Sequence, residues 1–244
     1  MALLFYTNPI LIAAAIIPAI WLLRNVYQAD VLEKEPKGLL LSLVLQGILA
    51  TFLALLTEQI GDSILYLLFQ EDTLIYHFLM YFVVVALSEE GFKYLLLYRR
   101  TWHSPDFNCR FDGVVYAVFV SLGFALWENI QYVTMYGLGT AAVRALTAVP
   151  GHACFGVFMG AWYGMARWYE NYGEYDKSRR YRRLALIVPT LLHGCYDFIA
   201  TISGTLFGMV FVAFIVLMFA TARRTVMRLS QDDRYIDNNG FFNR

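Results

Sequence analysis

The strongest constraint on this chain is a succession of apolar stretches, each long enough to cross a lipid bilayer. A transmembrane helix needs about 20 mostly apolar residues, and seven stretches meet this requirement: residues 3–23, 38–56, 74–98, 113–136, 142–168, 184–202 and 204–222. Only 16% of the residues are charged, whereas soluble domains carry about 25%. We therefore predict an all-α, polytopic transmembrane bundle of about seven spans.

The connections between these stretches predict how the chain is oriented. Lys and Arg are frequent after the first, third, fifth and seventh stretches, whereas the second and sixth connections contain none and the fourth only Arg144. The positive-inside rule then places the N-terminus outside and the C-terminus in the cytoplasm. We interpret residues 1–229 as one membrane domain and 230–244 as a short polar cytoplasmic tail.

Several features narrow the class of protein further. The first stretch has no basic n-region and no small-residue cleavage site, so we expect a retained helix and not a signal peptide. Segment 57–69 either continues the second helix or lies along the interface. A formal net charge of zero gives no reason to expect a nucleic-acid partner. The lipid bilayer is the expected environment.

Ionisable and polar residues inside the apolar stretches are the candidate functional residues, because each costs about 3 kcal/mol at the centre of a bilayer. They are Glu89, Glu90 and Lys93 on the third stretch, Glu128 and Asn129 on the fourth with Asp112 just before it, His152 on the fifth, and His193 and Asp197 on the sixth.

The spacing on the third and sixth stretches shows which of these residues share a helix face. Glu89 and Lys93 are four residues apart, so Lys93 can hold one carboxylate ionised, while Glu90 is rotated by about 100°. His193 and Asp197 are also four apart, and Asp197 can fix the imidazole tautomer or act as a second ligand.

The fourth stretch carries residues with simpler expected roles. We expect Asp112 to cap its helix at the interface, and Glu128 and Asn129 to link helices by hydrogen bonds. A single buried histidine or Glu–Lys pair is often structural. Two carboxylates, two histidines and an aspartate on three spans are, however, the groups that activate a water molecule.

Two chemistries fit these residues. His152, His193, Glu89 and Asp197 could bind zinc and lower the pKa of its water. Alternatively, Glu89 or Glu90 acts as general base, and the histidines complete the site; of the two we prefer Glu89, with Glu90 assisting. Because no HExxH motif is present, we prefer metal-free catalysis, with zinc as the open alternative. A proton- or ion-coupled transporter using the same buried charges is the alternative from another class, although no repeated halves are detected.

The residues also resemble a known family. SEEGFKYLLLY, FDGVVYAVFVSLGFALWENIQYV, VRALTAVPGHACFGVFMGAWYGMAR and VPTLLHGCYDFI resemble the four blocks of PrsW proteases, and EKEP resembles their first connection. The likeness covers residues 33–200. It implies a multi-pass protease of the bacterial cell membrane, distantly similar to CAAX prenyl endopeptidases and the Abi group.

The resemblance implies a reaction and a site as well. Members make the first (site-1) cut in a single-span anti-sigma factor on its extracytoplasmic side, which starts the release of a stress-response sigma factor. The following residues match family motifs: Glu89, Glu90 and Lys93 (EExxK), Glu128 and Asn129 (EN), His152, and His193 and Asp197 (HxxxD). We expect Glu89, Glu90, His152 and His193 to be catalytic, and Lys93, Asp197, Glu128, Asn129 and Asp112 to support them.

Overall fold

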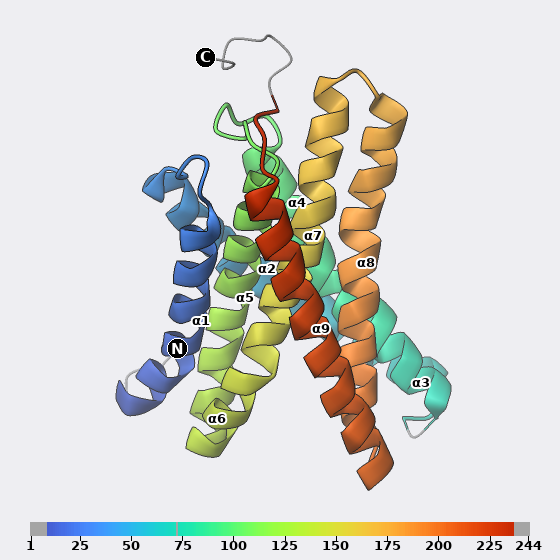
Figure 1. Ribbon diagram of the computed structural model, residues 1–244. Coiled ribbons are helices and arrows are strands. Elements are labelled where there is room, and N and C mark those ends of the chain that lie inside the picture. The colour runs from blue at the N-terminus through green and yellow to red at the C-terminus, as the bar shows by residue number, and fades with distance from the viewer. Residues whose placement is uncertain (1–8, 72, 237–244) are drawn as a thin grey trace.

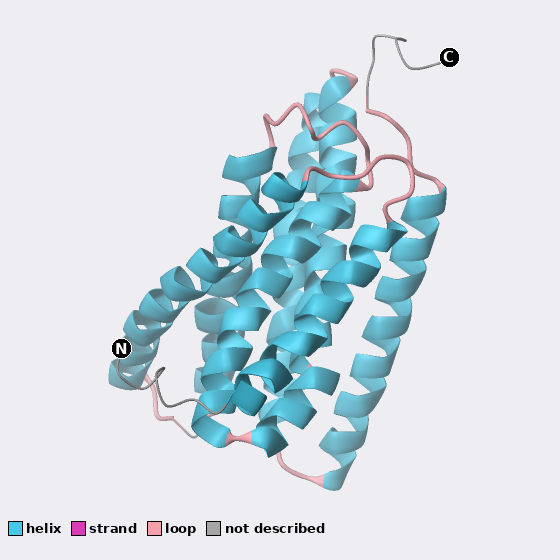
Figure 2. Ribbon diagram, turned by 90° about the vertical axis from the view of Figure 1, so that its left-hand side faces the viewer, coloured by secondary structure: helices cyan, strands magenta, loops and turns pink. Residues whose placement is uncertain are grey.

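The protein folds as a bundle of helices, and the computed structural model describes residues 9–71 and 73–236 (Figure 1). The helices are α1 (Pro9–Ala29), α2 (Lys37–Leu68), α3 (Leu74–Leu79), the π-helix η2 (Met80–Ala86), α4 (Leu87–Thr101), α5 (Asp112–Tyr136), α6 (Leu138–Leu146), α7 (Ala148–Asn171), α8 (Tyr175–Thr201) and α9 (Thr205–Gln231). Apart from one isolated bridge, the described residues form no strand (Figure 2). The all-α prediction is confirmed.

Among the described residues, seven helical segments are long and apolar enough to cross a membrane, as predicted. α3, η2 and α4 together make the third segment, and α6 and α7 make the fifth. α2 runs on to Leu68, so segment 57–69 continues the second helix up to that residue. The predicted first span starts at residue 3 and the predicted tail ends at 244; residues 1–8 and 237–244 lie outside the described residues. The orientation and the domain division stay predictions.

The helix α5 lies at the centre of the bundle, and 78% of its most apolar 18-residue stretch is buried. Glycines allow α7 to approach it: a Cβ atom built on Gly160 would lie 2.3 Å from the carbonyl oxygen of Gly113, and one on Gly156 would lie 2.9 Å from Oγ of Ser121. These glycines thus form a close packing face between α5 and α7.

The segment after α9 folds back onto the loop between α4 and α5. The amide of Arg110 donates to the carbonyl of Arg234 at 3.1 Å, and the amide of Ile236 donates to the carbonyl of Asn108 at 2.6 Å. The amide of Phe111 donates to Oδ1 of Asp233 at 2.8 Å. These bonds hold the described part of the tail against the bundle.

An acidic cluster, consisting of Asp30, Glu35, Asp112 and Asp233, lies at this same end. The predicted cap role of Asp112 is wrong, because its Oδ2 accepts the loop amides of Asn108 and Cys109 at 3.0 and 2.6 Å and no helix amide. Burial raises the pKa of Asp30 to about 6 and that of Glu35 to about 7. Asp112 therefore lies apart from the buried cluster of Glu89, Glu90, His152 and His193.

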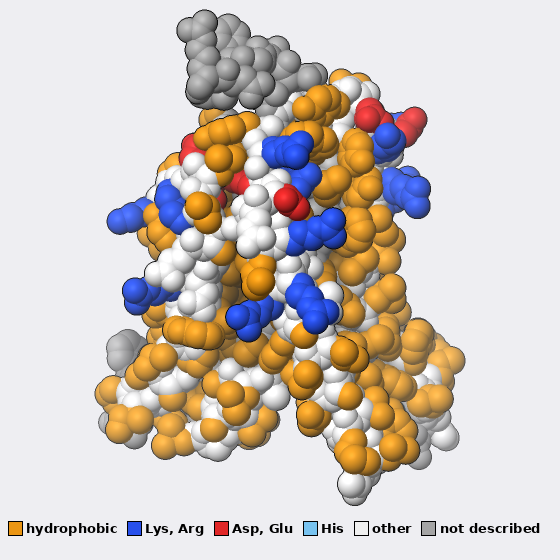
Figure 3. Space-filling view, in the orientation of Figure 1, with side chains coloured by type: hydrophobic (Ala, Val, Ile, Leu, Met, Phe, Trp, Pro, Cys, Tyr) orange, Lys and Arg blue, Asp and Glu red, His pale blue; other side chains and the backbone are white. Residues whose placement is uncertain are grey.

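Charge is distributed unevenly along the bundle. In Figure 3, Lys and Arg side chains gather in the upper half, around the C-terminal end of α9, while the lower half is covered by hydrophobic side chains. The upper half carries the loop between α7 and α8, the loop between α4 and α5, and the tail (Figure 1). This is the end that the positive-inside rule places in the cytoplasm.

Candidate active site

The third span changes helix type immediately before its charged residues. The π-helix η2 ends at Ala86 and α4 begins at Leu87, so Glu89 and Glu90 lie in the first turn of α4. π-Turns inside α-helices occur frequently at functional sites. The sequence shows no feature that predicts this π-helix.

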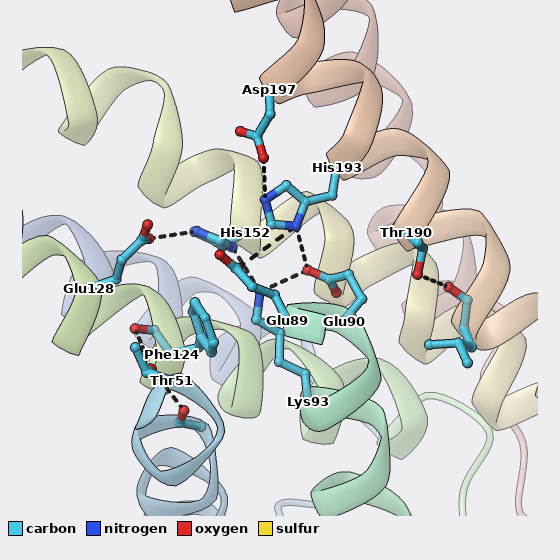
Figure 4. A network of polar contacts seen from close by, with 12 residues as sticks. Thr51, Glu89, Glu90, Lys93, Phe124, Glu128, His152, Thr190, His193 and Asp197 are labelled. Carbon is cyan, nitrogen blue, oxygen red and sulfur yellow. Dashed lines mark hydrogen bonds and ion pairs between the residues drawn. The ribbon is translucent and has the colours of Figure 1, made fainter. Parts of the chain in front are cut away.

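Lys93 lies at the centre of the polar cluster (Figure 4). Its Nζ is 3.1 Å from Oε2 of Glu89, 2.7 Å from Oε1 of Glu90 and 3.1 Å from Nδ1 of His152. It also lies 3.9 Å from the ring centroid of Phe124. The lysine therefore pairs with both carboxylates, and not with one as the helix geometry predicted.

His152 is held from both sides. Its Nδ1 faces the Lys93 ammonium, and its Nε2 lies 2.9 Å from Oε2 of Glu128. An ammonium can only donate, so Nδ1 accepts and the ring proton is on Nε2, where it is donated to Glu128. This contact fixes the neutral tautomer of His152 and gives Glu128 a role beyond linking helices.

His193 joins the cluster from α8. Its Nδ1 lies 3.0 Å from Oε1 of Glu90 and 3.9 Å from Oε2 of Glu89, and its Nε2 lies 3.3 Å from Oδ2 of Asp197. Its ring stacks on Phe155 of α7, with centroids 4.7 Å apart. Asp197 thus lies where the four-residue spacing predicted, behind the imidazole.

The charge pattern of the sequence places Arg144 in the fourth connection, near the start of the fifth stretch. The residue lies on α6, where Nη2 donates to Oε2 of Glu128 at 2.8 Å and Nε donates to Oδ1 of Asn129 at 2.9 Å. Asn129 in turn donates to the carbonyl of Ala15 on α1 at 2.8 Å. The chain of contacts from Arg144 through Glu128 reaches His152.

A cavity of about 360 Å³ opens beside these residues. Its lining includes Glu89, His152, His193 and Asp197, together with Glu58 of α2. The hydropathy pattern places Glu58 in the second connection. The alternative that residues 57–69 continue the second helix puts Glu58 inside a span, and this is what α2 shows. Glu90 is fully buried behind this lining, so Glu89 is the glutamate of the pair that faces the cavity.

The site has the donor set of a divalent metal. Glu89, Glu90, His152 and His193 each place one ligand atom within 4.8 Å of the others. Each imidazole is also bound by a carboxylate on its outer nitrogen, as is usual for metal-ligating histidines. Oε2 of Glu90 is buried without a partner among the described residues. Glu90 therefore replaces Asp197 in the predicted ligand set.

The residues consequently fit zinc in type and number. The Lys93 ammonium, however, lies 2.7–3.1 Å from atoms of three of the four donor residues. A metal ion and this ammonium would compete for the same donors.

Comparisons with known proteins show the family to which the chain belongs. The family model described as "PrsW family intramembrane metalloprotease" matches residues 35–221. Protease PrsW of Bacillus subtilis (strain 168) is 36% identical over 192 residues, covering 78% of this chain and 83% of that protein. Protease PrsW of Oceanobacillus iheyensis is 32% identical over 222 residues, covering 91% and 97%. No solved structure matches the chain.

The match spans more than half of the chain and includes every residue of the buried cluster. The relatives are themselves covered over most of their length. The chain belongs to the PrsW family of intramembrane proteases.

Proposed function

We propose that this protein is an endopeptidase that makes the first cut in a single-span membrane protein of the anti-sigma-factor type. The observation that carries the proposal is a carboxylate–histidine–lysine cluster, buried within membrane-spanning helices, beside a cavity of about 360 Å³. Membership of a protease family favours hydrolysis over ion transport by the same charges.

In the proposed mechanism, Glu89 is the general base. It takes a proton from a water molecule in the cavity, and the water oxygen attacks the carbonyl carbon of the scissile peptide. His193, which lines the cavity, stabilises the negative charge that forms on the carbonyl oxygen, and the buried Lys93 ammonium holds Glu89 in place. Glu89 then gives the proton to the leaving nitrogen, and the peptide bond breaks.

The other residues position these groups. Glu90 holds Lys93 and His193 in place through contacts of 2.7 and 3.0 Å. Asp197 orients His193 and Glu128 orients His152. His152 keeps its unprotonated nitrogen towards Lys93, which fixes the ammonium between the two glutamates.

Glu89, Glu90, His152 and His193 are the residues that would hold a zinc ion. Zinc would supply a bound water of lowered pKa. The contacts of Lys93 with three of these four residues favour the metal-free alternative. We therefore expect the purified, fully active protein to contain well under one equivalent of zinc, and its cleavage to survive chelator treatment. Stoichiometric zinc that is lost together with activity, and restored with it, would contradict this choice.

The proposed reaction is tested by sequencing the new N-termini of membrane proteins. Cells expressing the wild type, Glu89→Gln or His193→Ala at matched levels are compared, with the exposed-surface variant Arg100→Gln as control. We expect the wild type and the control to produce new N-termini on the extracytoplasmic side of single-span proteins, and the two site variants to produce none. Identical sets of termini from all four proteins would refute the proposal.

A further inference from the structure

A cavity of about 740 Å³ lies between α7 and α9, away from the residues of the cluster around Glu89. Its apolar wall comes largely from α7, through Phe158, Ala161, Trp162 and Met165. This spacing of three, four and seven residues presents one face of the helix. The wall therefore belongs to a membrane-spanning segment.

The rim of the cavity is basic. Arg228 of α9, Arg234 of the tail and Arg110 of the loop before α5 all line it, against a single carboxylate, that of Asp232. This carboxylate neutralises little, because Oδ2 of Asp232 lies 3.9 Å from Nε of Arg228 and both side chains are exposed. Three arginines thus line one opening.

The guanidinium group of Arg110 is held by contacts with the tail and with α7. Its Nη2 donates to the backbone carbonyl of Asp232 at 3.3 Å, and the guanidinium lies 5.8 Å from the ring centroid of Trp168. Its Nε atom is buried and has no hydrogen-bond partner among the residues that the structure describes. A buried donor of this kind is destabilising unless a ligand supplies an acceptor.

The cavity therefore combines an apolar wall with a basic rim at the end of the bundle where positive charge gathers (Figure 3). A phospholipid has the matching arrangement, with acyl chains below a phosphate. Guanidinium groups bind phosphate oxygens in a forked geometry, and basic pockets at the cytoplasmic side of membrane proteins suit anionic headgroups. A soluble phosphate would leave the apolar wall uncovered.

We propose that this cavity binds one anionic glycerophospholipid of the cytoplasmic leaflet, with its phosphate at Arg110, Arg228 and Arg234 and an acyl chain along α7. The lipid would join α7, α9 and the tail at the cytoplasmic end. The proposal does not depend on the proposed proteolysis.

Native mass spectrometry of the purified full-length chain tests it, with phosphatidylglycerol or phosphatidylcholine added in mixed micelles. The test variant is Arg228→Gln/Arg234→Gln. The matched control is Arg223→Gln/Arg224→Gln, which removes the same charge from exposed positions of α9 outside the cavity lining. We expect the wild type and the control to retain one phosphatidylglycerol, and the test variant to bind it on the order of tenfold more weakly.

Thermal unfolding supplies the second readout. Phosphatidylglycerol should raise the melting temperature of the wild type and the control more than that of the test variant, whereas phosphatidylcholine and sn-glycerol 1-phosphate should have little effect. Equal retention of phosphatidylglycerol by the two double variants, or equal retention of phosphatidylcholine by the wild type, would overturn the proposal. Full stabilisation by sn-glycerol 1-phosphate alone would show a soluble phosphate ligand and would equally overturn it.

Discussion

Lys93 is the residue on which the buried cluster depends most. Its ammonium is fully buried and is the nearest positive charge to Glu89 and Glu90, at 3.1 and 2.7 Å. Removing one partner of a buried ion pair usually costs about 3–5 kcal/mol, because the other charge stays behind without compensation. The same ammonium also donates a hydrogen bond to Nδ1 of His152.

We therefore predict that Lys93→Met lowers the free energy of unfolding by about 3 kcal/mol and abolishes cleavage. Adding Glu90→Gln to Lys93→Met should restore part of the stability, because it removes one uncompensated charge, and should leave the protein inactive. Thermal unfolding in detergent and a cleavage assay measure the two effects. A Lys93→Met variant with the melting temperature of the wild type would show that the cluster is not paired in this way.

Substitutions of Arg144 test how His152 is positioned, because they leave Glu89, Glu90 and Lys93 unchanged. Arg144 reaches His152 only through Glu128, by contacts of 2.8 and 2.9 Å. Loss of such an outer contact typically costs 10–100-fold in activity. Arg144→Ala should lower kcat by about tenfold or more, with a smaller change in KM, and Arg144→Lys should recover part of the loss. An equal loss in both variants, accompanied by equal loss of folded protein, would indicate a purely structural role.

At the level of elements, the site is assembled by helices that pack unusually closely. α5 carries Glu128, α7 carries His152, and glycines on both helices bring the two backbones together. On the third span, η2 changes the helix repeat directly before Glu89 and Glu90. The direction in which those glutamates point thus depends on a local change of helix type.

This packing predicts a contrast between two glycine-to-alanine variants. A Cβ on Gly160 would lie 2.3 Å from a backbone oxygen of α5, whereas a Cβ on Gly208 of α9 meets nothing within 4 Å. Gly160→Ala should destabilise the protein by about 1–3 kcal/mol. Gly208→Ala should be neutral or slightly stabilising, since Ala favours the helix by up to about 1 kcal/mol. Equal melting temperatures for the two variants would contradict the close contact of α5 and α7.

At the level of the whole molecule, the acidic cluster makes stability depend on pH. The pKa of Asp30 is raised to about 6 and that of Glu35 to about 7, chiefly because burial disfavours their ionised forms. The folded protein then binds more protons than the unfolded chain between about pH 4 and pH 7. This contribution to stability is complete below that window and is lost as the pH rises through it.

We accordingly predict that Asp30→Asn and Glu35→Gln reduce the loss of thermal stability between pH 5 and pH 8. The measurement is the melting temperature in detergent across this range, and the comparison with the wild type removes the effect of other titrating groups. Glu71→Gln, which changes an exposed carboxylate, is the control. A pH dependence unchanged by both cluster substitutions would contradict the burial of these carboxyl groups.

Much of the architecture is predictable from hydropathy alone. A long apolar segment in a bilayer must satisfy its backbone hydrogen bonds internally, and a helix does so within one segment. The residues of the cluster are predictable for a related reason: charges such as Glu89 and Glu90 inside an apolar span must find partners, and few other polar residues are available. The four-residue spacing of His193 and Asp197 also predicted their contact.

Other features lie beyond such reasoning. Glu58 was assigned to a connection because a window of about 20 residues ends a span too early when a helix is longer than the hydrocarbon core. Arg144 was counted with the fourth connection because it lies near the start of the fifth stretch, and its contacts with Glu128 and Asn129 are not visible in the sequence. Lys93 pairs with Glu90 as well as Glu89 because its flexible side chain reaches residues both three and four positions earlier. Asp112 accepts hydrogen bonds from loop amides because the loop before α5 folds back over its side chain. The tail packs against the same loop, and this packing is not visible in the sequence.

The central claim is that this chain itself hydrolyses a membrane protein at the Glu89 cluster. Its most direct test is to reconstitute purified wild type or Glu89→Gln into liposomes with a purified single-span protein identified by its new N-terminus, and to analyse the fragments by mass spectrometry. We predict one cut by the wild type on the extracytoplasmic side of the substrate's span, and intact substrate with a folded Glu89→Gln variant. Equal cleavage by both proteins, or none by a folded wild type, would contradict the claim.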